Sequence, residues 1–312
     1  MYHPYTRGKQ NELLALRETA DVLAGAAFVP IIEPVRKELG GLERALKELT
    51  DAGVEVVVIV NPRHGELRTA GRAISALLAR HYRNNDAISA GILLHSNIST
   101  AAAVALIDEH ADHNPVIIHA GFTEARALAQ ALGDRALSFT HVFVEDQAST
   151  LYRRHFEGAR RVLLRDGFEA MNNADYGTVD SFSDLHVTFP AFGVQGYGDF
   201  LTVGDRYTEG GGPAYAVAIH LTYIDSDNDE EMLIQHFVSD TNGTPSDTAG
   251  KFREALDKLI EEVDSGHSKI LGTSAVDEFR RLHADGHYPG LGYVKKLSMR
   301  HHIETLAHYH AP

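Results

Sequence analysis

The chain has 312 residues and is 44% hydrophobic, enough to bury a core the size of a barrel domain. Its 43 acidic and 29 basic side chains give a formal charge of -14, which repels nucleic-acid phosphates and anionic membranes. It has no cysteine, which excludes disulfides, thiolate metal sites and cysteine nucleophiles. Because it shows neither a signal-peptide pattern nor an apolar run of roughly 20 residues, we expect a cytoplasmic protein with no membrane partner, for which nucleic acid is a poor candidate partner.

The chain opens with a predicted helix and then alternates strands with helices. Residues 8–24 carry apolar side chains at helical spacing, so a helix is expected there. An apolar run over 28–35 predicts the first strand. A row of leucines at helical spacing predicts the next helix over 40–52, which Gly53 ends.

Five more apolar runs repeat this strand–helix unit. They predict strands at 54–61, 87–95, 115–119, 137–145 and 160–165. Segments with helical spacing separate them, at 68–82, 99–112, 123–132 and 147–158. Such a regular repeat favours parallel strands joined by right-handed crossovers.

The pattern changes after Asp166. Candidate strands lie at 184–190, 198–204 and 214–224, and the last pairs as a hairpin with 230–238. If 198–204 and 214–224 are the seventh and eighth strands, the sheet closes into a barrel. Three predicted helices follow, at 246–264, 273–284 and 297–309. The predicted fold class is α/β, a (β/α)₈ TIM-barrel-like fold whose last strands are joined by loops and a β-hairpin and followed by a helical segment.

We interpret residues 1–312 as a single barrel-like domain, because no linker and no low-complexity tract interrupts them. Regular strand–helix units occupy 1–166. An irregular β-rich part covers 167–245, and a helical C-terminal part covers 246–312.

Polar residues end successive predicted strands, and in a barrel these ends meet at one rim. The candidate catalytic residues on this rim are Glu33, His95, His119 and Glu145. The candidates for binding substrate are Asn61, Arg63, His64, Arg165, Asp166, Asp199 and His220. Carboxylates, imidazoles and guanidinium groups together suit acid/base or metal-assisted chemistry on an anionic small molecule.

Two parts of the rim allow more than one interpretation. Glu33 is either a general base or metal ligand, or a carboxylate that pairs with Arg36 or Arg165 at the barrel mouth. The loop over 61–65 either binds a phosphate or carboxylate through Arg63 or is an ordinary solvated turn.

A divalent metal is one option for this rim. His95 and His119 end consecutive predicted strands, and with Glu33 or Glu145 they would form a two-histidine, one-carboxylate site. In the alternative, each imidazole caps the following helix or bonds a backbone carbonyl.

Several motifs are missing from the sequence. No Gly-x-Gly-x-x-Gly follows a strand and no Walker loop is present, so no nucleotide cofactor is expected. The serine-hydrolase and zincin signatures are missing too. The glycines at 210–212 predict a mobile loop, and the acidic run over 225–231 predicts a hairpin tip rather than a calcium loop.

Three strings resemble a known family. They are Tyr2–Gln10 with Glu12–Leu13, then Val29–Pro34, and further downstream His236–Asp240. In this order they are similar to the bacterial and phage "beta protein" family and an allied uncharacterised bacterial branch. The resemblance implies a barrel-like α/β fold and a gene setting near mobile elements or phage defence, but no particular reaction.

The resemblance also singles out individual positions as candidate functional residues. They are Tyr5, Arg7, Lys9, Glu12, Glu33, His236 and Asp240. Arg7 and Lys9 thereby join the substrate-binding candidates. In the alternative, Lys9 and Glu12 are solvated residues in the first turn of the opening helix.

Two functions are compatible with these patterns. The first is a cytoplasmic enzyme, a hydrolase or lyase rather than an oxidoreductase, that acts on a small anionic or phosphorylated ligand with or without a divalent metal. The second is a non-catalytic recognition module of a phage-defence or mobile-element system, which binds a protein partner and works with an effector.

Overall fold

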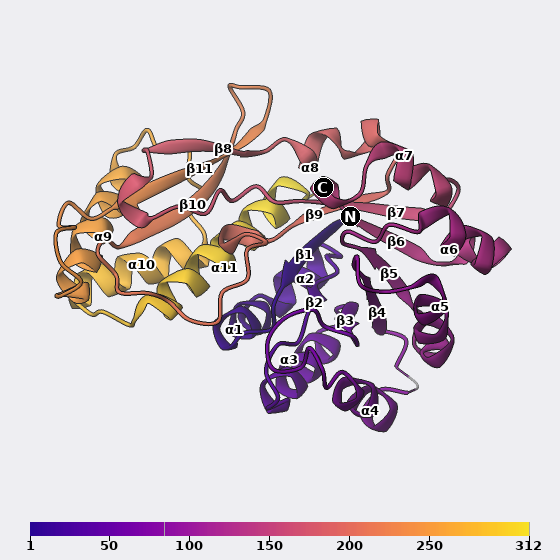
Figure 1. The fold of residues 1–312 in the computed structure, drawn as a ribbon. Coiled ribbons are helices and arrows are strands. Elements are labelled where there is room, and N and C mark those ends of the chain that lie inside the picture. Colours follow the sequence, from indigo (N-terminus) through magenta and orange to yellow (C-terminus); the bar gives the residue numbers. More distant parts are fainter. Residues whose placement is uncertain (84, 312) are drawn as a thin grey trace. The chain divides into compact units, whose positions relative to one another are not determined.

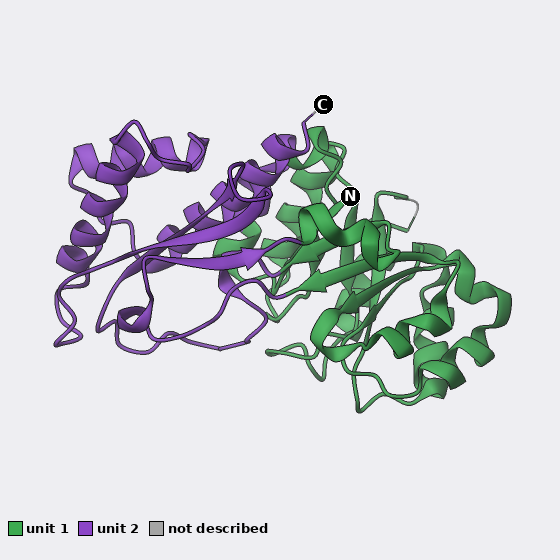
Figure 2. Ribbon diagram, turned by 90° about the horizontal axis from the view of Figure 1, so that it is seen from above, with its two compact units in different colours: residues 1–13, 23–165, 185–199 green, residues 14–22, 166–184, 200–312 purple. Residues whose placement is uncertain are grey.

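The computed structural model describes residues 1–83 and 85–311, so residues 84 and 312 lie outside the description. The chain divides into two compact units (Figure 2). Unit 1 comprises residues 1–13, 23–165 and 185–199, and unit 2 comprises residues 14–22, 166–184 and 200–312. The change of sequence pattern at Asp166 coincides with a boundary between the units. The single domain expected over 1–312 stays a prediction.

Unit 1 contains a closed barrel of parallel strands (Figure 1). Its strands, in hydrogen-bonded order, are β1 (Tyr2–Thr6), β2 (Ile31–Ile32), β3 (Val56–Ile59), β4 (Ile88–Leu94), β5 (Val116–His119), β6 (Thr140–Val144), β7 (Arg160–Arg165) and β9 (Gly196–Asp199). The barrel closes where β9 pairs with β1. The predicted TIM-barrel-like α/β fold is therefore confirmed.

Helices and short 3₁₀ turns connect these strands. The α-helices between β1 and β9 are α1 (Gln10–Glu18), α2 (Ala20–Gly25), α3 (Gly40–Asp51), α4 (Arg72–His81), α5 (Thr100–Glu109), α6 (Ala125–Leu132), α7 (Thr150–Arg153) and α8 (Leu185–Thr188). The 3₁₀ turns in the barrel are η1 (Ala111–His113), η2 (Gly133–Ser138), η3 (Glu145–Gln147), η4 (Arg154–Phe156) and η6 (Phe189–Phe192). Helices α3 to α6 lie on the outside of the barrel (Figure 1).

The apolar runs form strands because both faces of a parallel barrel sheet are covered. All four residues of β3, Val-Val-Val-Ile, are buried. On α3, the leucines Leu42, Leu46 and Leu49 share one buried face, as their helical spacing predicts.

The barrel differs from the prediction in its first and last strands. Residues 2–6, expected to precede the first strand, form β1, and residues 214–224, expected as the eighth strand, lie outside the barrel. The segment 184–190, expected as a strand, is helical in α8 and η6. β1 has no apolar run and contains Pro4, which argues against a strand in a sequence pattern, yet all its residues are buried.

A glycine allows β1 to close the barrel. His3 of β1 is in register with Gly198 of β9. A Cβ atom at Gly198 would lie 2.1 Å from the carbonyl oxygen of His3, so a larger residue would push the two strands apart.

Unit 2 is built on a three-stranded antiparallel sheet ordered β10 (Ala218–Asp225), β11 (Glu231–Val238) and β8 (Val179–Ser183). The predicted hairpin of β10 and β11 is confirmed. The helices α9 (Thr248–Asp264), α10 (Ser274–Asp285) and α11 (Leu291–Tyr309) follow, and the turns η5 (Asn173–Asp175) and η7 (Leu201–Val203) also belong to this unit. Residues of β10, β11 and the three helices form its apolar core, which includes Leu221, Phe252, Phe279 and Leu297.

None of the helices in the described residues combines the length and the apolar content that crossing a membrane requires.

Candidate functional site

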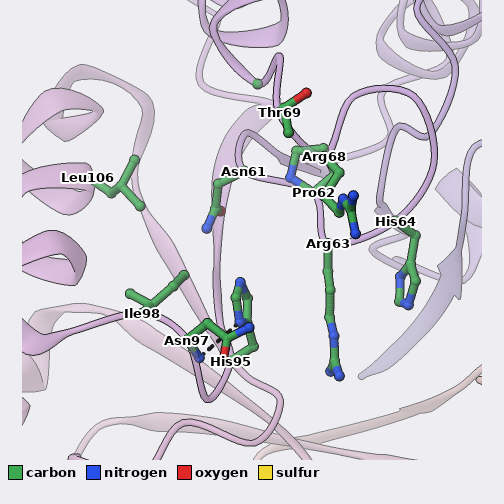
Figure 3. A pocket seen from close by; sticks show the side chains of 11 residues that line it. Asn61, Pro62, Arg63, His64, Arg68, Thr69, His95, Asn97, Ile98 and Leu106 are labelled. Carbon is green, nitrogen blue, oxygen red and sulfur yellow. Dashed lines mark hydrogen bonds between the residues drawn. The ribbon is translucent and has the colours of Figure 1, made fainter.

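A pocket of about 670 Å³ opens where β3 and β4 end (Figure 3). The β3–α4 connection contributes Asn61, Pro62, Arg63, His64, Arg68, Thr69 and Gly71, and the segment after β4 contributes His95, Asn97, Ile98 and Leu106. Because β3 and β4 are parallel neighbours, the loops at their carboxyl ends share one rim. Four predicted site residues, Asn61, Arg63, His64 and His95, are therefore brought together in one pocket.

Next to this pocket, the buried carboxylate of Glu33 accepts hydrogen bonds from several donors. Tyr5 Oη donates to Oε2 at 2.8 Å and Arg7 Nη1 donates to the same oxygen at 2.9 Å. The backbone N–H groups of Arg63 and His64 donate to Oε1 at 2.8 and 3.1 Å, and His64 Nδ1 lies 3.1 Å from Oε1. Glu33 thus fixes the start of the loop that lines the pocket.

These contacts keep Glu33 ionised. Burial raises the pKa of its carboxyl, but the hydrogen bond from His64 and the charge of Arg7 outweigh burial and bring the pKa to about 2. An ionised carboxylate only accepts hydrogen bonds, so the proton between it and His64 lies on Nδ1. A group with so low a pKa is a weak base at neutral pH, so we assign Glu33 a positioning role. Its arginine partner is Arg7, whereas Arg36 pairs with Glu66 and Arg165 with Glu145.

The lining of the pocket is cationic. Arg63 and Arg68 are exposed, and within residues 1–83 and 85–311 neither guanidinium forms an ion pair with a carboxylate. Among the described residues, no Asp or Glu lines the pocket. Gly71, which precedes α4, also lines it, so the positive end of the α4 dipole adds to the same field.

His95 is a neutral imidazole in this pocket. Its Nδ1 accepts the backbone N–H of Asn97 at 3.2 Å, the contact drawn in Figure 3. Burial lowers the pKa of His95, and the neighbouring Arg63 lowers it further. With Nδ1 acting as an acceptor, the ring proton lies on Nε2 and can be donated in a hydrogen bond.

Asn61 acts as a link between strands. Its Nδ2 donates to the carbonyl of Leu93 and its Oδ1 accepts the N–H of Leu93, both at 2.8 Å. The amide therefore holds the end of β3 against β4 from within the pocket lining.

His119 is not part of this pocket. It is fully buried, with Nδ1 2.6 Å from Tyr152 Oη and Nε2 2.9 Å from His141 Nδ1. His141 Nε2 lies 2.8 Å from the carbonyl of Ala136, which can only accept, so Nε2 carries the proton of the His141 ring. It follows that His119 Nε2–H donates to His141 Nδ1 and that the Tyr152 hydroxyl donates to His119 Nδ1. Burial, and then His141, hold the pKa of His119 well below its usual range.

The predicted metal set is not assembled. Within the part of the chain that the structure describes, no group of three His, Asp or Glu residues is placed to hold a metal ion. His119 faces aromatic side chains, including Phe143 and Phe156, instead of joining His95 and Glu33.

The remaining rim candidates have other partners. Arg165 forms a two-point contact with Glu145, at 2.6 and 3.2 Å, at the ends of β7 and β6. Asp199 is buried and accepts the hydroxyl of Tyr2 at 2.7 Å. Asp166 belongs to unit 2, where it accepts the backbone N–H of Asp205 at 2.8 Å.

His220 was expected to end a barrel strand, and this is wrong. It lies in β10 of unit 2, with Nδ1 2.7 Å from Nδ1 of His236. His236 Nε2 in turn lies 3.1 Å from Asp180 Oδ2, and Asp240 pairs with Lys258. A second pocket of about 540 Å³ is lined by His236, but Glu261 and Glu262 line it as well, so it lacks the uniform charge of the first.

The positions near the N-terminus that the family resemblance singled out belong to one hydrogen-bond network. Tyr5 and Arg7 donate to Glu33, and Glu12 Oε2 accepts the backbone N–H of Arg7 at 2.6 Å and that of Lys9 at 3.3 Å. Glu12 is buried, which raises its pKa. It therefore orders the loop that carries Arg7 instead of being a solvated residue of the opening helix.

Arg68 and Thr69 also line the pocket, although the sequence predicts a helix over 68–82. In the structure, α4 begins at Arg72. The first turn has no side-chain cap, so the sequence carried no sharp signal for the helix start. A longer loop leaves Arg68 free to face the pocket.

Comparison with family models, with curated proteins and with solved structures finds no match for this chain. The resemblance to the "beta protein" family, and the phage-defence setting that it implies, stay predictions.

Proposed function

We propose that the barrel mouth of unit 1 binds a small anionic ligand, best matched by a phosphate ester, and that it is the active site of a hydrolase or lyase. One observation carries this proposal. Arg63 and Arg68 line one pocket that contains no lining carboxylate among the described residues.

Charge supports an anion as the occupant. Two guanidinium groups that line one cavity give it a positive potential, which favours a negatively charged occupant. Arginine also offers paired N–H donors, which match the oxygens of a phosphate or carboxylate. The N-terminal end of α4 favours the same sign of ligand charge.

The two histidines supply the chemistry. His95 offers Nε2–H as a neutral donor to an oxygen of the ligand. His64, whose Nδ1 is held by the ionised Glu33, is the acid/base group. A carboxylate that orients an imidazole stabilises the ring when it takes up a proton. Proton transfer of this kind serves the hydrolysis of an ester and the elimination step of a lyase alike.

The experiment is a titration of the full chain with inorganic phosphate, followed by calorimetry. We expect Arg63→Gln and Arg68→Gln each to weaken binding about tenfold or more, because each removes a charge-assisted contact. Arg80→Gln is the matched control: Arg80 is exposed in the last turn of α4, at the end away from Gly71. The proposal is supported if the two pocket variants lose affinity for phosphate and the Arg80→Gln control does not.

Two results would contradict it. One is a wild-type chain that binds neither inorganic phosphate nor phenyl phosphate. The other is an Arg63→Gln, Arg68→Gln double variant that binds phosphate as the wild type does. If the wild-type chain bound phosphate esters but converted none of them, the site would bind without catalysis, as the recognition module requires. An activity that His64→Ala left unchanged would contradict the acid/base role of His64.

A further inference from the structure

The pocket at the barrel mouth is larger than its charged part requires. Its volume of about 670 Å³ lies within the range of sites that enclose a whole organic molecule, roughly 300–1,000 Å³. A phosphate group bound by Arg63 and Arg68 would fill only a fraction of it. The rest of the cavity must therefore match the body of the ligand.

The two sides of the pocket differ in chemistry. In Figure 3, Ile98 and Leu106 lie on one side, whereas Arg63 and His64 lie on the other. Ile98 follows β4 and Leu106 belongs to α5, and both are half-buried. The apolar side therefore comes from one neighbouring loop and helix, and the cationic side from the β3–α4 connection.

The two apolar side chains offer a ligand no hydrogen bond. Asn61, between the two sides, is held in place by its two hydrogen bonds to the backbone of Leu93. The part of a ligand that packs on Ile98 and Leu106 finds no hydrogen-bond partner on these two side chains, so hydroxyl groups placed there would lose their water contacts, which is unfavourable. An apolar body would bury these two side chains, which is favourable.

From this division we infer that the ligand is an amphipathic organic phosphate, in which a phosphate group carries an apolar, hydrocarbon or aromatic body. The inference rests on the proposed function, because it takes the cationic side as the phosphate site. It excludes inorganic phosphate and phosphates of small polyols as the preferred ligands.

The test compares three probes on the full chain by calorimetry: inorganic phosphate, glycerol 3-phosphate and phenyl phosphate. We expect phenyl phosphate to bind about tenfold more tightly than the other two, because its ring buries apolar surface that they lack. The Ile98→Thr, Leu106→Gln double variant should remove this advantage and leave the affinity for inorganic phosphate unchanged. Leu151→Gln, at a leucine that is 68% exposed on α7, is the matched control and should bind all three probes as the wild type does.

The outcomes separate the two proposals. If inorganic phosphate and phenyl phosphate both fail to bind, the proposed function is wrong. If inorganic phosphate binds in an arginine-dependent way but phenyl phosphate binds no more tightly, or glycerol 3-phosphate binds best, only the amphipathic ligand is wrong. Circular dichroism and urea unfolding show whether the double variant is folded. Any loss of inorganic phosphate binding in the folded double variant would also contradict the assignment of Ile98 and Leu106 to the ligand body alone.

Discussion

Two histidines near the ends of neighbouring strands, His95 and His119, have opposite surroundings in unit 1. His95 lines a cationic pocket and is half-buried, whereas His119 is fully buried against Tyr152, Phe156 and a second histidine. Both were candidates for one site because both end apolar runs. Position at a strand end is therefore not sufficient to place a side chain in the barrel mouth.

The register of the strands explains the difference. His119 of β5 is paired with Leu94 of β4, so His95 lies one residue further along than the partner of His119. Side chains alternate between the two faces of a sheet, and a shift by one residue reverses the face. His119 shares its face with Phe143, its partner on β6, and on this face it packs against Tyr152 of α7 and Phe156 of η4. The pairing register, not the distance along the chain, decides which imidazole reaches the pocket.

The largest loss of stability is expected from substitution of Glu33, whose carboxylate holds the loop that lines the pocket together with His95. Glu33→Ala removes the acceptor of the Arg7 guanidinium and of the Arg63 and His64 N–H groups. Removing one partner of a buried ion pair costs roughly 3–5 kcal/mol, so we expect this loss in urea unfolding. Glu66→Gln, at the exposed pair with Arg36, should change stability by less than about 1 kcal/mol. Equal effects of the two variants would contradict the positioning role.

The sequence was informative where one local pattern was sufficient. The apolar runs located β3 to β7, and the polar ends of β3 and β4 led to Arg63, His64 and His95. It was misleading where long-range pairing decides. β1 is short, polar and contains Pro4, and it is a strand only because β2 and β9 lie on either side of it. Likewise, no local signal showed that Glu33 would meet Arg7.

The pH dependence of stability gives a second test of the Glu33 network. The folded pKa of Glu33, about 2, is below its ordinary value of 4.5. The ionised form therefore stabilises the fold fully above pH 4.5, and this contribution is lost as pH falls towards 2, by about 3 kcal/mol in total. Unfolding of wild type and Glu33→Gln is measured in urea between pH 7 and pH 3. We expect the stability difference between them to shrink as the pH falls, and a constant difference would contradict the depressed pKa.

The smallest effects compare the two histidines directly. His119→Ala leaves His141 Nδ1 and the Tyr152 hydroxyl without their buried partner and opens a cavity, which costs roughly 2–3 kcal/mol in urea unfolding. It should leave phosphate affinity unchanged, because His119 is not among the described residues that line the pocket.

His95→Ala should do the opposite. It should weaken phosphate binding about tenfold through the loss of the Nε2–H donor. It should change stability by less than about 1 kcal/mol, because the side chain is half-buried. If His119→Ala weakened phosphate binding as much as His95→Ala does, both imidazoles would serve one site, and the face reversal argued from the register would be wrong.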